Sequence, residues 1–173
     1  MKAFISLACV AFASALSIDI AAAQTTIAGC TNVGQTAAAQ TLRCEGGITI
    51  VAENGARYSL NDRNHDGHID QVELTAKALL LDVPKQRRDK TFEVTTPQAI
   101  AAVRGTKWAV DAAEGKTSVF VARGRVAVGR SAGGGQRVVL GPGEGVDVEP
   151  AGSLIVKRWP AARVAALMAR LGQ

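Results

Sequence analysis

The sequence predicts an all-β domain, built either as a solenoid-like roll of short strands or as a sandwich, with an amphipathic helix at its C-terminus. From Gly46 onward, apolar and polar residues mostly alternate with a period of two, which is the pattern of strands that bury one face. Turns rich in Gly separate these runs at short intervals, as is typical of all-β folds. Residues 160–171 change to a helical period and predict the terminal helix.

The expected strands begin with two runs, 48–51 and 57–60, on either side of Asn54-Gly55. An Asn-Gly pair between two such runs is the sequence signal of a tight β-hairpin. A polar loop at 61–70 then precedes an apolar run at 72–83 and a charged turn at 84–90. The later expected strands are 92–95, 107–111, 117–122, 125–129, 137–140 and 146–149.

The helix carries an apolar stripe with the spacing i, i+3, i+4 and i+7: Val164, Leu167, Met168 and Leu171. Pro160 suits its first position, and Arg163 and Arg170 fall outside the stripe. Such a stripe either docks on a partner or covers the core of its own domain. We expect it to cover its own core, because such stripes are usually buried within the domain that carries them.

Residues 1–23 have the three parts of a secretory signal peptide. Lys2 supplies the positive start, residues 3–20 are mostly apolar, and Ala21-Ala22-Ala23 offers the small residues that a signal peptidase reads. A retained membrane anchor is the alternative, but the run is short for a span of about 20 apolar residues. We expect cleavage near Ala23, a periplasmic or secreted protein, and no membrane span after cleavage.

Removal of the signal would leave 150 of the 173 residues, enough for one domain with its own core. We expect an N-terminal segment at 24–45, a β domain at 46–155 and the helix within 156–173. Cys9 leaves with the signal, so Cys30 and Cys44 form an even pair in an oxidising compartment and predict a disulfide. This bond would close a loop of roughly 15 residues, worth about 3 kcal/mol in the chain-entropy model.

The charge pattern argues against a nucleic-acid partner. The net charge is +5, but the basic residues are scattered apart from the run 85–90, and aromatic residues make up only 4% of the chain. Nucleic-acid binding usually needs clustered basic residues with aromatic stacking partners. We therefore interpret the basic run as a solvated loop, with contact to anionic polymers of the cell envelope left open.

Three ordered pieces of sequence resemble the core signature of the FecR domain. They are Phe92-Glu93-Val94-Thr95-Thr96-Pro97, then Val103-Arg104-Gly105-Thr106, then Trp108-Ala109-Val110. The resemblance extends over residues 78–149 and implies a non-catalytic periplasmic β module, often with a solenoid-like arrangement of short strands. The founding members relay iron-siderophore signals to a sigma factor. This sequence shows neither their cytoplasmic anti-sigma segment nor a retained transmembrane helix, so we do not carry over the signalling role.

The motif residues also have a physical interpretation, as structural positions: Pro97, Arg104, Gly105, Thr106 and Trp108. Pro97 keeps Thr96 extended and suits the end of a strand. Gly105 allows a backbone bend at a point where a larger side chain would clash with its neighbours. Arg104 is expected to hold that corner through a carboxylate such as Asp111 or Asp147.

Residues 62–73 match the calcium loop of an EF-hand. The expected ligands alternate along the chain: Asp62, Asn64, Asp66, His68 through its backbone carbonyl, Asp70 directly or through water, and Glu73 through both oxygens. Gly67 stands where this loop must turn sharply, and Ile69 would point inward. Because a hairpin precedes the loop, we expect a lone Ca²⁺ site between β elements and not an EF-hand domain.

Two alternatives stay open for this loop. The first is a polar hairpin turn in which Asp and Asn side chains accept hydrogen bonds from their own backbone. The second, less favoured, is a transition-metal site at His65, His68 and Asp70.

The leading functional hypothesis is therefore an exported, non-catalytic FecR-like interaction or structural module, stabilised by Ca²⁺ and binding an envelope protein or polymer. An exported hydrolase acting on envelope polysaccharide is the first alternative. Both histidines of the chain lie in the polar loop, so no Ser-His-Asp set exists outside it. A calcium sensor is the second alternative, and it is disfavoured because one unpaired site makes a large conformational switch difficult.

Overall fold

The computed structural model describes residues 29–85, 91–132 and 135–173. The signal segment 1–23, with Cys9, and most of the charged turn 84–90 lie outside these ranges. The described elements are β1 (Cys30–Gln35), β2 (Ala39–Cys44), the short 3-10 helix η1 (Glu45–Gly47), β3 (Thr49–Glu53), β4 (Arg57–Asn61), β5 (Gln71–Asp82), β6 (Phe92–Thr95), β7 (Ala99–Val103), β8 (Lys107–Ala113), β9 (Lys116–Arg123), β10 (Val126–Arg130), β11 (Arg137–Leu140), β12 (Glu144–Val148), β13 (Lys157–Arg158) and α1 (Ala161–Arg170). The all-β prediction with a C-terminal helix is confirmed.

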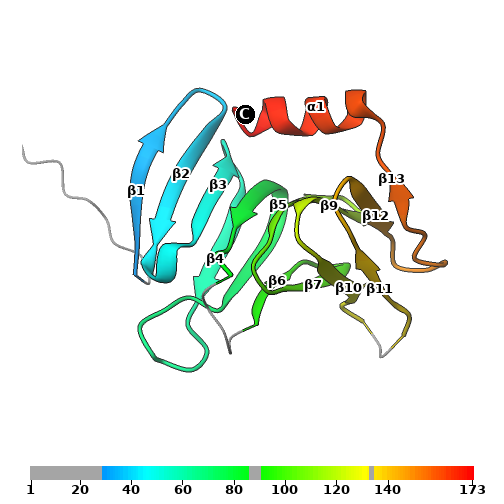
Figure 1. Ribbon diagram of the computed structural model, residues 1–173, viewed down its shortest axis with the longest axis horizontal. Helices are drawn as coiled ribbons and strands as arrows, with labels where there is room; N and C mark the ends of the chain where they lie inside the picture. Colours follow the sequence, from blue (N-terminus) through cyan, green and yellow to red (C-terminus); the bar gives the residue numbers. More distant parts are fainter. Residues whose placement is uncertain (1–28, 86–90, 133–134) are drawn as a thin grey trace, which may run out of the picture.

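The strands form one curled sheet that folds back on itself as two layers (Figure 1). Layer A has the order β1-β2-β3-β5-β8-β9-β12-β13, and layer B has the order β4-β5-β6-β7-β10-β11. Strand β5 belongs to both, because residues 71–76 pair with β4 while residues 77–82 pair with β8. The change of layer falls at Lys77, whose φ of 66° bends the strand.

The prediction of a β-hairpin at Asn54-Gly55 is wrong. Strands β3 and β4 do not pair with each other; each pairs with a different half of β5, in a different layer. The turn itself is tight, since the Ala56 amide donates to the Glu53 carbonyl at 2.8 Å. Gly55 has a positive φ of 76°, but Asn54 does not, whereas the type I′ turn of a two-residue hairpin needs both. The turn therefore carries the chain from one layer to the other.

Later strands alternate between the layers in pairs. β6 and β7 pair in layer B, β8 and β9 in layer A, β10 and β11 in layer B, and β12 and β13 in layer A. Short arches at 104–106, 124–125 and 141–143 connect one layer to the next. This alternation produces the roll that the short runs and Gly turns predicted.

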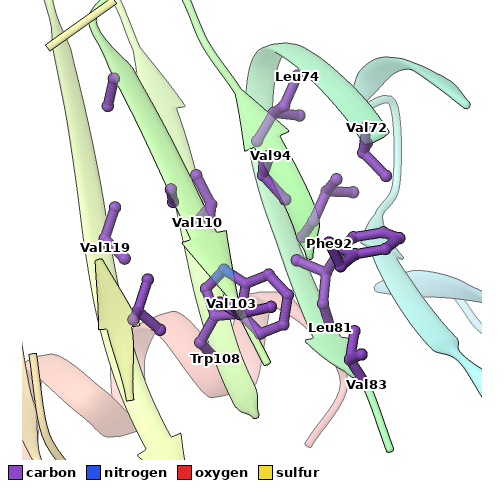
Figure 2. Packing of buried hydrophobic residues seen from close by; sticks show 14 of the residues in the cluster. Val72, Leu74, Leu81, Val83, Phe92, Val94, Val103, Trp108, Val110 and Val119 are labelled. Atoms are coloured by element: carbon purple, nitrogen blue, oxygen red, sulfur yellow. The ribbon is translucent and has the colours of Figure 1, made fainter. Parts of the chain in front are cut away.

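The main core lies between the two layers (Figure 2). Trp108 is fully buried there, and its ring meets the Phe92 ring edge-on, with 6.1 Å between centroids. A second apolar cluster lies on the outer face of layer A, where Leu167 of α1 and Leu171, directly after the helix, cover it. The helix thus covers its own domain, as its stripe predicted. No helix among the described residues has the length and hydropathy needed to cross a membrane.

Candidate functional site

The predicted calcium loop is the connection between β4 and β5. These strands pair antiparallel, and their last pair, Asn61 and Gln71, closes a loop of residues 62–70. The Asp70 amide donates to the Asn61 carbonyl at 3.0 Å, and Ile69 is buried with only 1% of its surface exposed. Gly67 has a φ of 85°, in agreement with its expected place at the sharp turn. The strands on both sides agree with a loop between β elements and not with an EF-hand domain.

Within the loop, the side-chain oxygens of alternate residues turn toward the backbone. Asp62 accepts hydrogen bonds from the amides of Asp66, at 3.2 Å, and Gly67, at 2.7 Å. Asn64 accepts from the Asp66 amide at 3.2 Å, and Asp66 from the His68 amide at 3.0 Å. These bonds correspond to the polar-turn alternative, and they gather three predicted ligand side chains around one short segment.

The remaining predicted ligands lie apart from that segment. Asp70 accepts from the Arg63 amide at 3.2 Å and also contacts the Arg63 guanidinium. Glu73 is an exposed residue of β5, opposite Ser59. Within the described residues, no group of three or more His, Cys, Asp or Glu side chains has an arrangement that would hold a metal. Calcium binding stays a prediction.

The loop packs against the start of the β1–β2 hairpin. His68 Nδ1 lies 3.4 Å from a carboxylate oxygen of Glu45, whereas Asp70 contacts Arg63. Two of the three residues suggested for a transition-metal site, His68 and Asp70, therefore contact different side chains. A Cβ atom at Gly29 would lie 2.9 Å from the Gly67 carbonyl oxygen. Cys30 and Cys44 form the predicted disulfide at the base of this hairpin, and both are buried. The bond therefore fixes the surface on which the loop rests.

The Thr96-Pro97 motif forms the turn between β6 and β7. The Thr96 amide donates to the Ala99 carbonyl at 2.8 Å, and the Ala99 amide donates back to the Thr96 hydroxyl at 2.8 Å. The buried Thr96 and Thr117 hydroxyls are 2.7 Å apart, which links layer B to layer A. Pro97 therefore ends a strand, as expected, and its neighbour Thr96 joins the two layers.

The Arg104-Gly105-Thr106 motif forms the arch between β7 and β8. Gly105 has a φ of 66°, and a Cβ atom there would lie 2.9 Å from the Lys85 Cα. Thr106 is fully buried, and its hydroxyl donates to the Arg125 carbonyl of the next arch at 3.0 Å. Arg104 is exposed on this arch. The carboxylates suggested as its partners bind arginines of α1 instead: Asp147 binds Arg163, and Asp111 binds Arg170.

These helix contacts were not foreseen from the sequence. Arg163 donates from Nη1 to Asp147 at 3.0 Å and lies over the Trp159 ring, 3.6 Å from its centroid. Partial burial alone would raise the pKa of Asp147, but hydrogen bonds from Arg163 and Ser118, with nearby positive charge, outweigh it and hold the pKa below its usual value. At the other end of α1, hydrogen bonds to Asp111 and Glu53 raise the pKa of Arg170. The only available signal was that both arginines lie off the apolar stripe.

The fold, the Thr96-Pro97 turn and the Arg104-Gly105-Thr106 arch define a FecR-type β domain. The chain belongs to the FecR family: the family model described as FecR protein matches residues 31–127. A search of curated proteins gives no match to this chain. The family and fold are those of a regulatory or interaction module.

Two solved structures share the fold, both of a candidate anti-sigma factor from Parabacteroides distasonis. The structure at 1.65 Å resolution has a TM-score of 0.61 and 22% identity, and the match covers 75% of this chain and 60% of that one. The structure at 2.50 Å has a TM-score of 0.63 and 21% identity, with 80% and 64% covered. The chain thus spans less than two thirds of either protein, and at this identity the likeness shows the fold alone.

Proposed function

We propose that this chain is an exported, non-catalytic interaction module of the cell envelope, stabilised by Ca²⁺ bound at residues 62–73. The FecR-family match over residues 31–127 supports the interaction role most strongly. The partner we expect is an envelope protein, with an envelope polymer as the alternative.

The contacts of polar side chains support a non-catalytic role. Ser118 donates to Asp147 at 2.6 Å, the kind of pair that could begin a catalytic set, but the next residue in the chain of contacts is Arg163. An arginine does not release its proton near neutral pH and cannot serve as a general base. Both histidines of the chain lie in the loop between β4 and β5, which leaves Ser118 without one.

The buried Cys30–Cys44 disulfide supports export, because such bonds persist in oxidising compartments. A fusion of the full chain to a reporter enzyme that folds only after disulfide formation tests this. We expect reporter activity from the full fusion and none after deletion of residues 2–23. Equal activity from both fusions would contradict export.

The arrangement of Asp62, Asn64 and Asp66 supports calcium binding, since Ca²⁺ takes several oxygen ligands from one short, sharply turned loop. At about 1 mM Ca²⁺ and a dissociation constant of about 0.1 mM, binding would stabilise the fold by about 1.4 kcal/mol. This corresponds to an upward shift of about 3–6 °C in the melting temperature.

Thermal unfolding with Ca²⁺ and with excess chelator measures this shift. Asp66→Asn keeps the oxygen that accepts from the His68 amide but removes one negative charge, so it should abolish the shift and leave the melt in chelator nearly unchanged. Glu114→Gln, on the exposed turn between β8 and β9, removes the same charge elsewhere and should keep the shift. Identical wild-type melts with and without Ca²⁺ would leave the loop as a polar turn.

A further inference from the structure

Helix α1 crosses the strands of layer A, from β12, where Asp147 binds it, to β3, where Glu53 binds it (Figure 1). Beneath it lies an apolar row of register partners on β5, β8 and β9: Leu80, Ala109 and Phe120. On one side of this row lies a polar row that faces the arginines of α1: Asp111, Ser118 and Asp147. On the other side lies a row of charged side chains: Asp82, Lys107 and Arg123. The sheet therefore meets the two edges of α1 with different chemistry.

The two edges of the apolar stripe of α1 are held differently. An α-helix has about 3.6 residues per turn, so Arg163 and Arg170 lie at one edge of the stripe, and Val164 and Met168 lie at the other. Both arginines bind carboxylates of the sheet, and the leucines between the two edges are buried. Val164 and Met168 are only half-buried, and among the described residues no hydrogen bond or ion pair joins their edge to the sheet. Polar contacts thus fasten the helix along one edge only.

A groove of about 400 Å³, open to solvent, lies along the second edge, between α1 and layer A. Most of the side chains that line it are apolar: Leu80, Phe120, Ala122, Val164 and Met168. Small-molecule sites have volumes of about 300–1,000 Å³ and are mostly apolar, with a few polar groups that orient the ligand. Methionine adapts its unbranched side chain to ligands of different shape. The groove therefore has the size and lining of a site for a small apolar ligand.

Lys107 is the one ionised side chain among those that line the groove. It is half-buried and lies in register with Asp82 on one side and Arg123 on the other. These two neighbours bind each other at 2.7 Å, and within the described part of the chain Lys107 makes no ion pair. Its ammonium group is therefore available to an anion at the border of the apolar lining.

We propose that this groove binds a single-chain amphiphile with an anionic head group, such as a fatty acid of medium length. The apolar chain would lie on Leu80 and Phe120, and its carboxylate would accept hydrogen bonds from the Lys107 ammonium. This inference goes beyond the proposed interaction role and does not depend on it.

An apolar segment of a partner protein is the other occupant to consider, and the groove favours it less. Leu80 and Phe120 keep only 3% and 5% of their surfaces exposed, so the opening between helix and sheet is narrow. A peptide would also bring an N–H and a C=O group for each residue onto a lining that offers few hydrogen-bond partners. An unbranched alkyl chain carries no such groups.

Titration calorimetry with octanoate and with octanol at neutral pH tests the proposal, because the two ligands share an apolar chain and differ in charge. Both should bind the wild-type protein at one site. Lys107→Met keeps a long side chain but removes its charge, so it should weaken octanoate by about fivefold and leave octanol within about twofold of wild type. Lys116→Met removes the same charge on the same face of layer A, on the far side of α1, and should bind both ligands as wild type does.

A second pair of variants tests the position of the site. Ala122 is exposed on β9, so Ala122→Phe can place its ring in the groove and should weaken both ligands by about tenfold or more. Ala113→Phe, at an exposed position of β8 on the other side of α1, adds the same ring and should leave binding within about twofold of wild type. Matching melting temperatures would confirm that all the variants are folded.

Each contrary result has a distinct meaning. Absence of octanoate binding, or equal loss of octanoate in Lys107→Met and Lys116→Met, would overturn the proposal. A protein adduct from a photo-reactive amino acid at position 122 in cells, without octanoate binding, would assign the groove to a partner protein instead. Binding to phosphatidylglycerol vesicles without binding of free octanoate would overturn it in favour of a membrane surface. The interaction role is tested separately, by cross-linking from the exposed positions of layer B, and none of these binding results decides it.

Discussion

Arg163 joins helix α1 to the outer face of layer A, and its replacement by alanine measures what this contact contributes. The guanidinium binds Asp147 and lies 3.6 Å from the centroid of the Trp159 ring. The side chains of Arg163 and Asp147 keep 39% and 38% of their surfaces exposed, so solvent screens the ion pair and we assign it about 0.5–1 kcal/mol. The cation–π contact adds about 0.5–1 kcal/mol. Arg163→Ala should therefore reduce the free energy of unfolding by about 1–2 kcal/mol.

The ion-pair part of this loss should depend on pH in one direction. The pKa of Asp147 lies below its ordinary value of 3.8 in the folded protein. A carboxyl group with a lowered folded pKa stabilises the fold above its unfolded pKa, and this contribution disappears as the pH falls through the folded pKa. The difference between wild type and Arg163→Ala should be full at neutral pH and should shrink below pH 3.8. The cation–π part should persist.

Thermal unfolding followed by circular dichroism measures both effects, with an expected decrease in melting temperature of about 2–8 °C at neutral pH. Arg163→Lys keeps the charge but not the paired hydrogen bonds and should fall between wild type and alanine. Arg43→Ala, at an exposed position on β2, should leave the melting temperature unchanged within about 1 °C. Unchanged stability of Arg163→Ala would refute the role of the contact, and a loss that is equal at acid and neutral pH would refute the ion-pair part.

Three further substitutions test the parts of the fold that the motifs build. Gly124→Ala should cost about 1 kcal/mol more than Gly115→Ala in free energy of unfolding. Both glycines have a positive φ, but only at Gly124 would a Cβ atom lie less than 3.0 Å from neighbouring atoms. Equal losses would contradict the close packing of the arches. Thr96→Val should cost about 1–2 kcal/mol in free energy of unfolding, because it removes the hydroxyl that bonds to Thr117 across the two layers. Thr96→Ser keeps a hydroxyl and should regain most of this stability. A valine variant as stable as wild type would show that the hydrogen bond contributes nothing. Replacing both Cys30 and Cys44 by serine should cost about 3 kcal/mol in chemical denaturation, and a change below about 1 kcal/mol would indicate that the hairpin holds without its bond.

The fold class was predictable because it depends on local patterns. Alternation of apolar and polar residues marked the later strands, and the stripe from Val164 to Leu171 marked the helix and its buried face. Asn54-Gly55 shows where local reasoning failed: the pair does form a tight turn, but β5 is long enough to pair with β3 through one half and with β4 through the other. Such long-range pairing is not visible in a tetrapeptide.

The candidate sites show the same contrast between local sequence patterns and long-range contacts. The loop from Asp62 to Asp70 was found from spacing within one segment, and its buried Ile69 and its turn at Gly67 agree with that spacing. The stacking of the arches could not be found in this way, because Thr106 and Arg125 become neighbours only when the chain folds. The contacts of Arg163 and Arg170 with the sheet also join residues distant in sequence.

The central claim is that this FecR-family chain is an exported module that binds another protein, and cross-linking in the cell tests it most directly. A photo-reactive amino acid at Val139, an exposed apolar position on layer B, is compared with one at Ser59, an exposed polar position on the same layer. We predict an adduct of defined size in the envelope fraction from position 139 and none from position 59. No adduct from position 139, from Ser59 or from the other exposed apolar positions, Val33 and Ile155, would contradict the claim.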